Sequence, residues 1–268
     1  MFSLFMLCVL VPLSSIQAST PILFDHASNG NNCTTFPPNC TSDSWFQTVG
    51  TGSNGILIVE LDAGGAPASS VTFGSQSLTQ IAGASVDFWS LADPAMGNKM
   101  ITATYSTAYL TILGGSVSYF NVASTGAVVS NSGSGGSGGS GTMASISVPT
   151  TPGDMVVDQL SAATQLGPVV FSPTGPGQVE RWDSGPVPVF PVFSARDGGS
   201  EQPASGSSVT MSWSLASSNL IQWTLNAVAL IPFTAPPIPE YPLGLPILTI
   251  LIVIAYGVIR RRTIHKHS

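Results

Sequence analysis

Carboxylates are the side chains in this sequence whose types and spacing could support catalysis or metal binding. Glu60 and Asp62 are two residues apart, so they share one face if this segment is a strand. Two further pairs are close in sequence, Asp154 with Asp158 and Glu180 with Asp183. Paired carboxylates hydrolyse glycosidic bonds, and clustered carboxylate oxygens bind calcium, which is the better of these two alternatives for an extracellular β-protein. The simpler interpretation is that acids at strand ends and in loops keep a weakly charged protein soluble.

Other catalytic arrangements lack the residues that they require. His26 is the one histidine before the C-terminal tail, so a Ser-His-Asp or Cys-His site would depend on a single residue near the N-terminus. The Gly/Ser tract 131–141 contains a Gly-x-Ser-x-Gly-like string, but it has neither a strand-to-helix elbow nor the Lys of a phosphate-binding loop. We therefore expect a protein that is not an enzyme and has no catalytic residues, no bound metal and no cofactor. A secreted carbohydrate-active hydrolase that uses paired carboxylates is the alternative, and calcium remains a candidate ligand.

The five tryptophans divide into two groups by their surroundings in the sequence. Trp89, Trp213 and Trp223 lie in strand patterns and are expected in the core. Trp45 and Trp182 are the candidates for exposed rings that stack on sugars.

Alternating apolar and polar residues predict the elements that must position these side chains. In residues 208–215, Val209, Met211, Trp213 and Leu215 alternate with Ser and Thr, as an antiparallel strand with one buried face requires. Residues 55–61 are apolar on both faces except for Glu60. Further strands are predicted at 69–73, 77–81, 86–91, 100–106, 110–122, 142–148, 155–160, 178–182, 189–195 and 220–231.

The fold class expected from these strands is all-β. Twelve or so strands suit one antiparallel sandwich of two sheets over residues 45–233, with the Gly/Ser tract 131–141 as a flexible loop and residues 19–44 as an N-terminal arm. The segments GILIVELD, VDFWSLADPAMGNKMITATYS, TPGDMVVDQLSA and SSVTMSWSL also resemble a jelly-roll-like module of secreted bacterial and archaeal proteins, over about Trp45 to Pro232. That resemblance implies that both halves fold together, and it implies no activity.

The C-terminal segment has the pattern of a membrane anchor. Residues 243–259 contain no charged residue and are long enough for a transmembrane helix at the short end of the range. Arg260, Arg261 and Arg262 follow, in the tail 260–268, and place that end in the cytoplasm by the positive-inside rule. The remainder of the chain is then expected outside the membrane, at the cell surface.

A short motif precedes the apolar segment, within the Pro-rich stalk 234–242. Pro239, Glu240, Tyr241 and Pro242, followed by the apolar segment and the arginines, resemble the sorting signals of the PEP-CTERM and PEF-CTERM families. The resemblance implies recognition by a transpeptidase of the exosortase or archaeosortase type. Two outcomes stay open, cleavage near the motif with transfer to a surface acceptor, or retention of the helix.

The N-terminus has the pattern of a secretory signal. Residues 1–18 are apolar and end in small residues, which predicts cleavage after Ala18. Residues 19–238 then carry twelve acids against Lys99, Arg181 and Arg196, a net charge of −9. Because nucleic-acid binding depends on clustered cations, we expect no nucleic-acid partner. The membrane and surface glycans are the expected partners.

Export also governs the interpretation of the cysteines. Cys33 and Cys40 are the cysteines that remain after removal of the signal, and an oxidising compartment favours a disulfide between them. A loop this short adds about 2 to 3 kcal/mol of stability in the chain-entropy picture. Asn32 and Asn39 each begin an Asn-Cys-Thr sequon and are candidate N-glycosylation sites. The expected function is structural, adhesive or glycan-binding.

Overall fold

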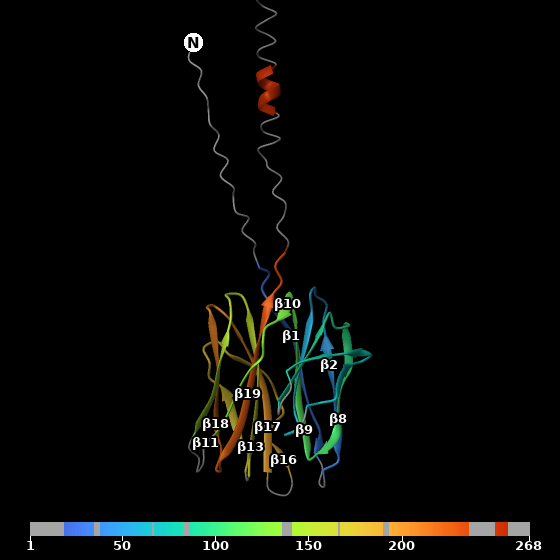
Figure 1. Ribbon diagram of the computed structural model, residues 1–268, viewed down its shortest axis with the longest axis vertical. Coiled ribbons are helices and arrows are strands. Elements are labelled where there is room, and N and C mark those ends of the chain that lie inside the picture. Colours follow the sequence, from blue (N-terminus) through green and yellow to red (C-terminus); the bar gives the residue numbers. More distant parts are fainter. Residues whose placement is uncertain are drawn as a thin grey trace, which may run out of the picture. The chain divides into compact units, whose positions relative to one another are not determined.

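Antiparallel β-strands form nearly all of the regular structure. The computed structural model describes residues 19–34, 38–65, 67–82, 86–135, 141–165, 167–189, 193–235 and 250–256. Residues 19–233 form one compact unit, and residues 250–256 are a short helical segment outside it (Figure 1). The expected all-β class with antiparallel sheets is confirmed.

The first half of the unit contains two sheets. The first inner sheet has the order β1-β9-β3-β7-β6, and the first outer sheet has the order β2-β8-β4-β5. Their bounds are β1 (Leu23–Thr34), β2 (Cys40–Val49), β3 (Ile56–Asp62), β4 (Ser70–Phe73), β5 (Gln76–Ser77), β6 (Thr79–Ala82), β7 (Val86–Ala92), β8 (Gly97–Tyr109) and β9 (Thr111–Phe120).

The second half repeats this connectivity. The second inner sheet runs β10-β19-β13-β17-β15, with β11 also paired to β19 and β16 to β17, and the second outer sheet runs β12-β18-β14. Their bounds are β10 (Val122–Thr125), β11 (Val129–Gly135), β12 (Thr142–Pro149), β13 (Met155–Thr164), β14 (Val170–Pro173), β15 (Val179–Asp183), β16 (Val187–Val189), β17 (Phe193–Pro203), β18 (Ser208–Ala216) and β19 (Ile221–Pro232). The order β11-β19-β13-β17-β15 corresponds strand by strand to β1-β9-β3-β7-β6.

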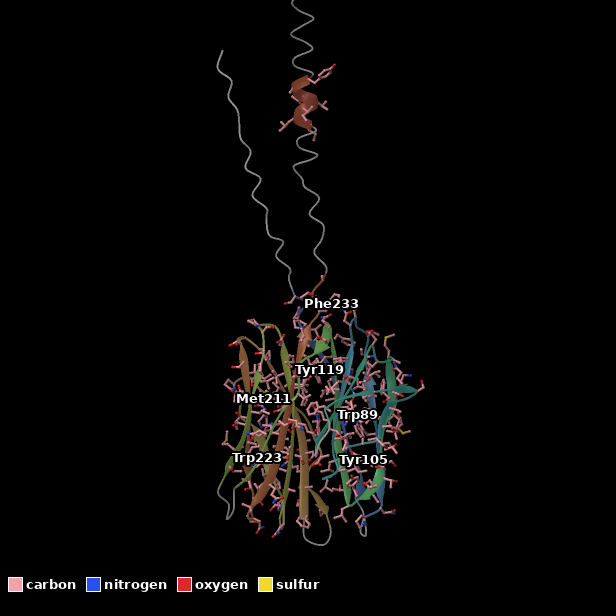
Figure 2. All side chains as sticks on the ribbon, viewed as in Figure 1. Trp89, Tyr105, Tyr119, Met211, Trp223 and Phe233 are labelled. Atoms are coloured by element: carbon pink, nitrogen blue, oxygen red, sulfur yellow. A yellow bond between two sulfur atoms is a disulfide. The ribbon has the colours of Figure 1, made fainter. Side chains whose placement is uncertain are left out.

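Three apolar clusters show how the four sheets pack. One lies between the first inner and outer sheets and includes Phe73 and Ile101, and a second lies between the second inner and outer sheets and includes Met211 and Trp213. The third joins the two inner sheets and includes Tyr119. Figure 2 shows Tyr119 between the halves, with Met211 in the second half and Trp89 and Tyr105 in the first. The expectation of one two-sheet sandwich is therefore wrong, because the described chain forms two sandwiches that pack through their inner sheets.

This packing explains the apolar pattern of residues 55–61. Strand β3 is covered by the first outer sheet on one face and by the second inner sheet on the other, so Ile56 to Leu61 are buried on both sides. The alternation in β18 is confirmed as well, since Val209, Met211, Trp213 and Leu215 are all buried. Sequence periodicity thus predicted the faces of individual strands correctly.

Two segments expected to lie outside the sheets are strands. The prediction of an N-terminal arm over residues 19–44 is wrong, because β1 pairs with β9 along the edge of the first inner sheet and β2 begins at Cys40. The prediction of a flexible loop over residues 131–141 is wrong for its first half. Asn131 to Gly135 belong to strand β11, which pairs with β19. A Cβ atom on Gly133 would lie 2.6 Å from Trp223 Cζ2, so glycine there makes room for the indole. Residues 136–140 lie outside the described residues.

The predicted terminal segments fall largely outside the described residues. These include the signal 1–18, the motif 239–242, Arg260 to Arg262 and most of the span 243–259. Residues 250–256 are helical with exposed side chains. Over the parts of the chain that the structure describes, there is no helix with the length and apolarity needed to cross a membrane.

Candidate functional site

A row of polar side chains lies where the two inner sheets meet. We call it the carboxyl seam and define it as Glu60, Asp62, Gln159, Ser161 and Asp197. Alternate residues of a strand face the same side, so β3, β13 and β17 each present their members toward the opposite half. Glu60, Gln159 and Asp197 are completely buried. Buried carboxyls are costly unless they are protonated or paired, so this row is unusual between two packed sheets.

Trp182 of β15 occupies the middle of the seam. Its indole Nε1 donates a hydrogen bond to Glu60 Oε2 at 2.9 Å. A Cβ atom on Gly115 of β9 or on Gly199 of β17 would lie 2.1 Å from the indole ring. The flat glycine backbones of the two facing strands therefore create the space that this ring fills, and the ring connects the halves.

Asp62 and Asp197 meet the same hydroxyl group further along the seam. Ser161 Oγ donates a hydrogen bond to Asp62 Oδ2, and the same hydroxyl lies close enough to Asp197 to act on its pKa. Asp62 accepts a second bond from the backbone N–H of Gly64 at 2.6 Å, and Asp197 accepts one from Gln159 Nε2 at 3.2 Å. Two carboxyls from different halves thus lie beside one serine.

The seam contains hydrogen-bonding capacity that its neighbours do not use. Glu60 Oε1, Gln159 Oε1 and Asp197 Oδ1 are buried and have no hydrogen-bond partner among the described residues. Buried oxygens without a hydrogen-bond partner are tolerated when the carboxyl is protonated or when a small polar molecule binds beside them.

Burial changes the protonation of these acids. Desolvation raises the pKa of Glu60 well above its usual value, and the nearby Asp158 charge raises it further. Desolvation likewise raises the pKa of Asp62, against the bond from Ser161. It also raises the pKa of Asp197, and the charge of Asp62 adds to that effect. These carboxyls are held toward their neutral forms.

Asp158 faces the core of the second sandwich. It accepts hydrogen bonds from Trp213 Nε1 at 2.8 Å and from the backbone N–H of Ser200 at 3.0 Å. Burial still raises its pKa to about 7, because desolvation outweighs these bonds. Its position anchors the core tryptophan, so its role is structural.

A pocket opens at the Asp62 end of the seam. Its volume is about 480 Å³, within the usual range for small-ligand sites. Asp62 and Ser161 supply polar groups to its lining, and Tyr109, Leu113, Phe193 and Ala195 are among its apolar and aromatic walls. Both halves contribute, so the pocket exists only because the sandwiches pack together. A second hollow of about 370 Å³ shares Ala163 and Phe193 with it.

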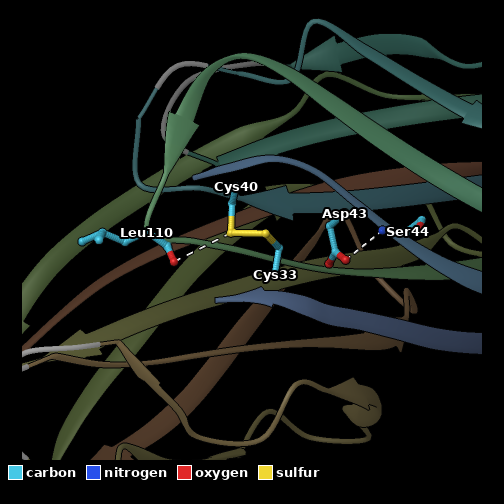
Figure 3. The surroundings of a disulfide bond; sticks show 5 residues. All are labelled: Cys33, Cys40, Asp43, Ser44 and Leu110. Atoms are coloured by element: carbon cyan, nitrogen blue, oxygen red, sulfur yellow. Dashed lines mark hydrogen bonds between the residues drawn. A yellow bond between two sulfur atoms is a disulfide. The ribbon is translucent and has the colours of Figure 1, made fainter. Parts of the chain in front are cut away.

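The disulfide lies close to Leu110, a residue of the pocket lining (Figure 3). Cys33 and Cys40 are bonded, which confirms that prediction, and they join β1 to β2. The carbonyl oxygen of Leu110 lies 3.9 Å from Cys40 Sγ, and Leu110 also lines the pocket. The covalent link thus restrains the turn that carries Tyr109 and Leu110. Asn39 is exposed next to this link, and the side chain of Asn32 lies outside the described residues.

The interpretation of the acids as solubilising groups is wrong for several positions. Glu60 and Asp158 are completely buried, and Asp154 is 5% exposed, where it bonds the backbone N–H of Thr151 at 2.7 Å. Glu180 does lie at the surface, and Asp183 pairs with Arg196. Neither of these two joins the seam, so the Glu180–Asp183 pair is not brought to the pocket.

The expected exposure of two tryptophans is also wrong. Trp45 and Trp182 are each 5% exposed, and both indole N–H groups donate inside the protein, to Ser116 Oγ and Glu60 Oε2 respectively. Trp89 and Trp213 are buried as predicted, whereas Trp223 is only partly buried. The aromatic residues that line the pocket are instead Tyr109 and Phe193.

Sequence reasoning missed the residues that complete the site. Asp197 and Ser161 lie in strands with many polar residues, and nothing in their spacing shows that β17 and β13 face another sheet. The duplicated strand pattern was the signal that could have suggested two sandwiches and a buried surface between them. No group of three or more His, Cys, Asp or Glu in the described ranges is arranged to hold a metal ion.

Comparisons with known proteins do not assign the chain to a family. No protein-family description matches it, and no curated protein matches it. One solved structure, described as "Structure of infectious bursal disease virus Gt strain", aligns over 93% of this chain and 92% of that chain at 10% identity. Its TM-score of 0.15 is too low to support an argument about fold or function.

Proposed function

We propose that this is an exported protein of the cell surface with an adhesive, glycan-binding role, and that its ligand enters the pocket beside Asp62. The observation that carries the proposal is the pocket itself, which combines the polar groups of Asp62 and Ser161 with the aromatic side chains of Tyr109 and Phe193. Sugar recognition needs both, because hydroxyls require acceptors and the apolar face of a ring packs on aromatic side chains. A purely structural coat protein would have no need of a pocket built by both halves.

Each half is proposed to be a jelly roll. The strand orders β1-β9-β3-β7 and β2-β8-β4-β5 alternate between two sheets as jelly-roll strands do. The second half repeats the first order as β11-β19-β13-β17 and three strands of the second as β12-β18-β14. Folds of this kind occur in lectins and in other proteins, so the fold alone does not determine the role.

The location is proposed from the two ends of the sequence. Residues 1–18 support export, and residues 243–259 with Arg260 to Arg262 support an anchor in the membrane. The motif 239–242 supports processing by an exosortase- or archaeosortase-type transpeptidase. Mass spectrometry of the protein from its native surface would distinguish a cleaved chain from one that retains the anchor.

Filling the pocket should remove ligand binding. We expect full-length Ala163→Phe to lose at least about tenfold in affinity for glycans that the unmodified protein captures on a glycan array, because the ring occupies the ligand's space. Ala95→Phe is the matched control, since Ala95 is exposed in a loop outside the pocket. Unchanged capture by Ala163→Phe, or no capture by the unmodified protein, would reject the proposal.

A hydrolase remains the second candidate for a specific reason. Asp62 and Asp197 lie on either side of Ser161, and the charge of Asp62 raises the pKa of Asp197, so the two carboxyls do not ionise together. Release of reducing sugar from a captured glycan, abolished by Asp62→Asn, would favour this function over binding alone.

A further inference from the structure

The pocket has a carboxyl group but no positive side chain. Asp62 contributes to the lining, and Asp197 lies behind it across Ser161. None of the residues that line the pocket is Lys, Arg or His. A buried carboxylate normally has a cationic partner or a metal ion, so this pair lacks the group that would balance its ionised form.

The cations of the described chain are engaged elsewhere. Arg181 pairs with Glu201 and covers the ring of Phe24, with the guanidinium carbon 3.8 Å from the ring centroid. Arg196 pairs with Asp183 and covers Phe171. Of the other two basic residues, Lys99 lies beside the Gly74 turn, and His26 bonds Asp25 at 2.7 Å. None of these four basic side chains therefore neutralises the charge of Asp62.

The walls suit a ring that carries a positive group. Tyr109 packs against Gly65, where an added Cβ would lie 2.5 Å from Tyr109 Cε1, so the ring is held close to the Asp62–Gly64 turn. Phe193 is 45% exposed and lies at the other side of the lining, in the second half. Aromatic faces attract ammonium groups as well as the apolar faces of sugars.

We propose that the pocket binds an amino sugar of a glycan, with the ammonium group of the sugar against the carboxylate of Asp62. The inference rests on the proposed glycan-binding function and names the class of sugar. Acidic sugars are excluded, because their carboxylates would approach Asp62 and Asp197 without any cation in the lining. An N-acetylated sugar has the same ring but lacks the charge, so it should bind more weakly.

Binding of this kind moves a proton. Burial raises the pKa of Asp62, so this carboxyl loses its proton at a higher pH than an exposed aspartate does. An adjacent ammonium favours the carboxylate, so the sugar releases a proton to the solvent at any pH where the free carboxyl is still partly protonated. The binding enthalpy should then depend on the ionisation enthalpy of the buffer, which a neutral sugar would not cause.

Isothermal titration calorimetry of the full-length protein tests the inference. We expect glucosamine oligosaccharides to bind about tenfold more tightly than their N-acetylated counterparts, with different apparent enthalpies in phosphate and Tris buffers. Asp62→Asn should remove both the preference and the buffer dependence. Asp93→Asn, in an exposed turn outside the pocket, should retain both. Proton release by the unmodified protein provides a readout that does not depend on the folding of a variant.

The outcomes separate this inference from the proposed function. Equal affinity for the two oligosaccharides would overturn the amino-sugar inference and leave glycan binding intact. Spermidine binding as tightly as the glucosamine oligosaccharide would overturn the sugar part and indicate a free polyamine. Failure of both oligosaccharides to bind, while other glycans are captured on the array and lost on Ala163→Phe, would also overturn the inference alone. No capture of any glycan would reject both.

Discussion

Gly115→Ala is expected to destabilise the protein by about 3 kcal/mol or more, although it adds one methyl group. The new Cβ would lie 2.1 Å from two atoms of the Trp182 ring, which is rigid and packed between β9 and β17. Moving the ring would also withdraw the hydrogen bond from Glu60, whose other oxygen already has no partner. Urea denaturation of the full-length protein measures the change in the free energy of unfolding.

The matched control is Gly206→Ala. An added Cβ there meets no atom within 4 Å, and its backbone has no positive φ. We expect this change to be nearly neutral. If Gly115→Ala unfolds at the same urea concentration as the unmodified protein, Trp182 does not fill the interface as described.

The folded protein should lose stability as the pH rises from about 5 to about 8. A buried acid with a raised pKa binds its proton more tightly in the folded state, so the folded state holds more protons than the unfolded state across this interval. Its contribution is complete below the unfolded pKa and is lost as the pH passes the folded pKa. The pKa of Asp158 is raised from 3.8 to about 7, which alone corresponds to roughly 4 kcal/mol. Glu60, Asp62 and Asp197 shift in the same direction.

Glu60→Gln should flatten this dependence. The amide oxygen can still accept the Trp182 bond, and the side chain can no longer ionise inside the interface. Thermal unfolding of the full-length protein at pH 5 and pH 8 measures the effect. Between pH 5 and pH 8, the unfolding midpoint of the variant should fall less than that of the unmodified protein. Asp93→Asn is the control, because Asp93 is exposed and lies outside the seam. A midpoint that rises toward pH 8 in the unmodified protein would contradict the account.

The sequence predicted strands well because alternation records which face each strand buries. The burial of one face of β18 could be predicted without knowing the tertiary structure, because every second residue is apolar: Val209, Met211, Trp213 and Leu215. The same logic was wrong for β11, where Gly and Ser residues suggested a loop. There the pairing with β19 and the space required by Trp223 determine the structure.

The site was less predictable because it depends on which sheets face each other. Glu60 could be recognised as a polar residue in an apolar strand, but the spacing of Asp197 and Ser161 does not show that β17 and β13 face another sheet. Trp45 and Trp182 were placed at the surface for the same reason. Trp45 is covered within the first sandwich and Trp182 is covered between the two sandwiches, in both cases by residues far away in the sequence.

Hydrogen–deuterium exchange of the full-length protein, with and without a glycan that it captures, tests most directly whether the ligand binds between the two sandwiches. The glycan is expected to slow exchange in peptides from both halves, at 60–65 and 108–113 in the first and at 161–165 and 193–197 in the second. Ala163→Phe should abolish this protection, and Ala95→Phe should keep it. Protection confined to one half, or located on the outer sheets, would contradict the account.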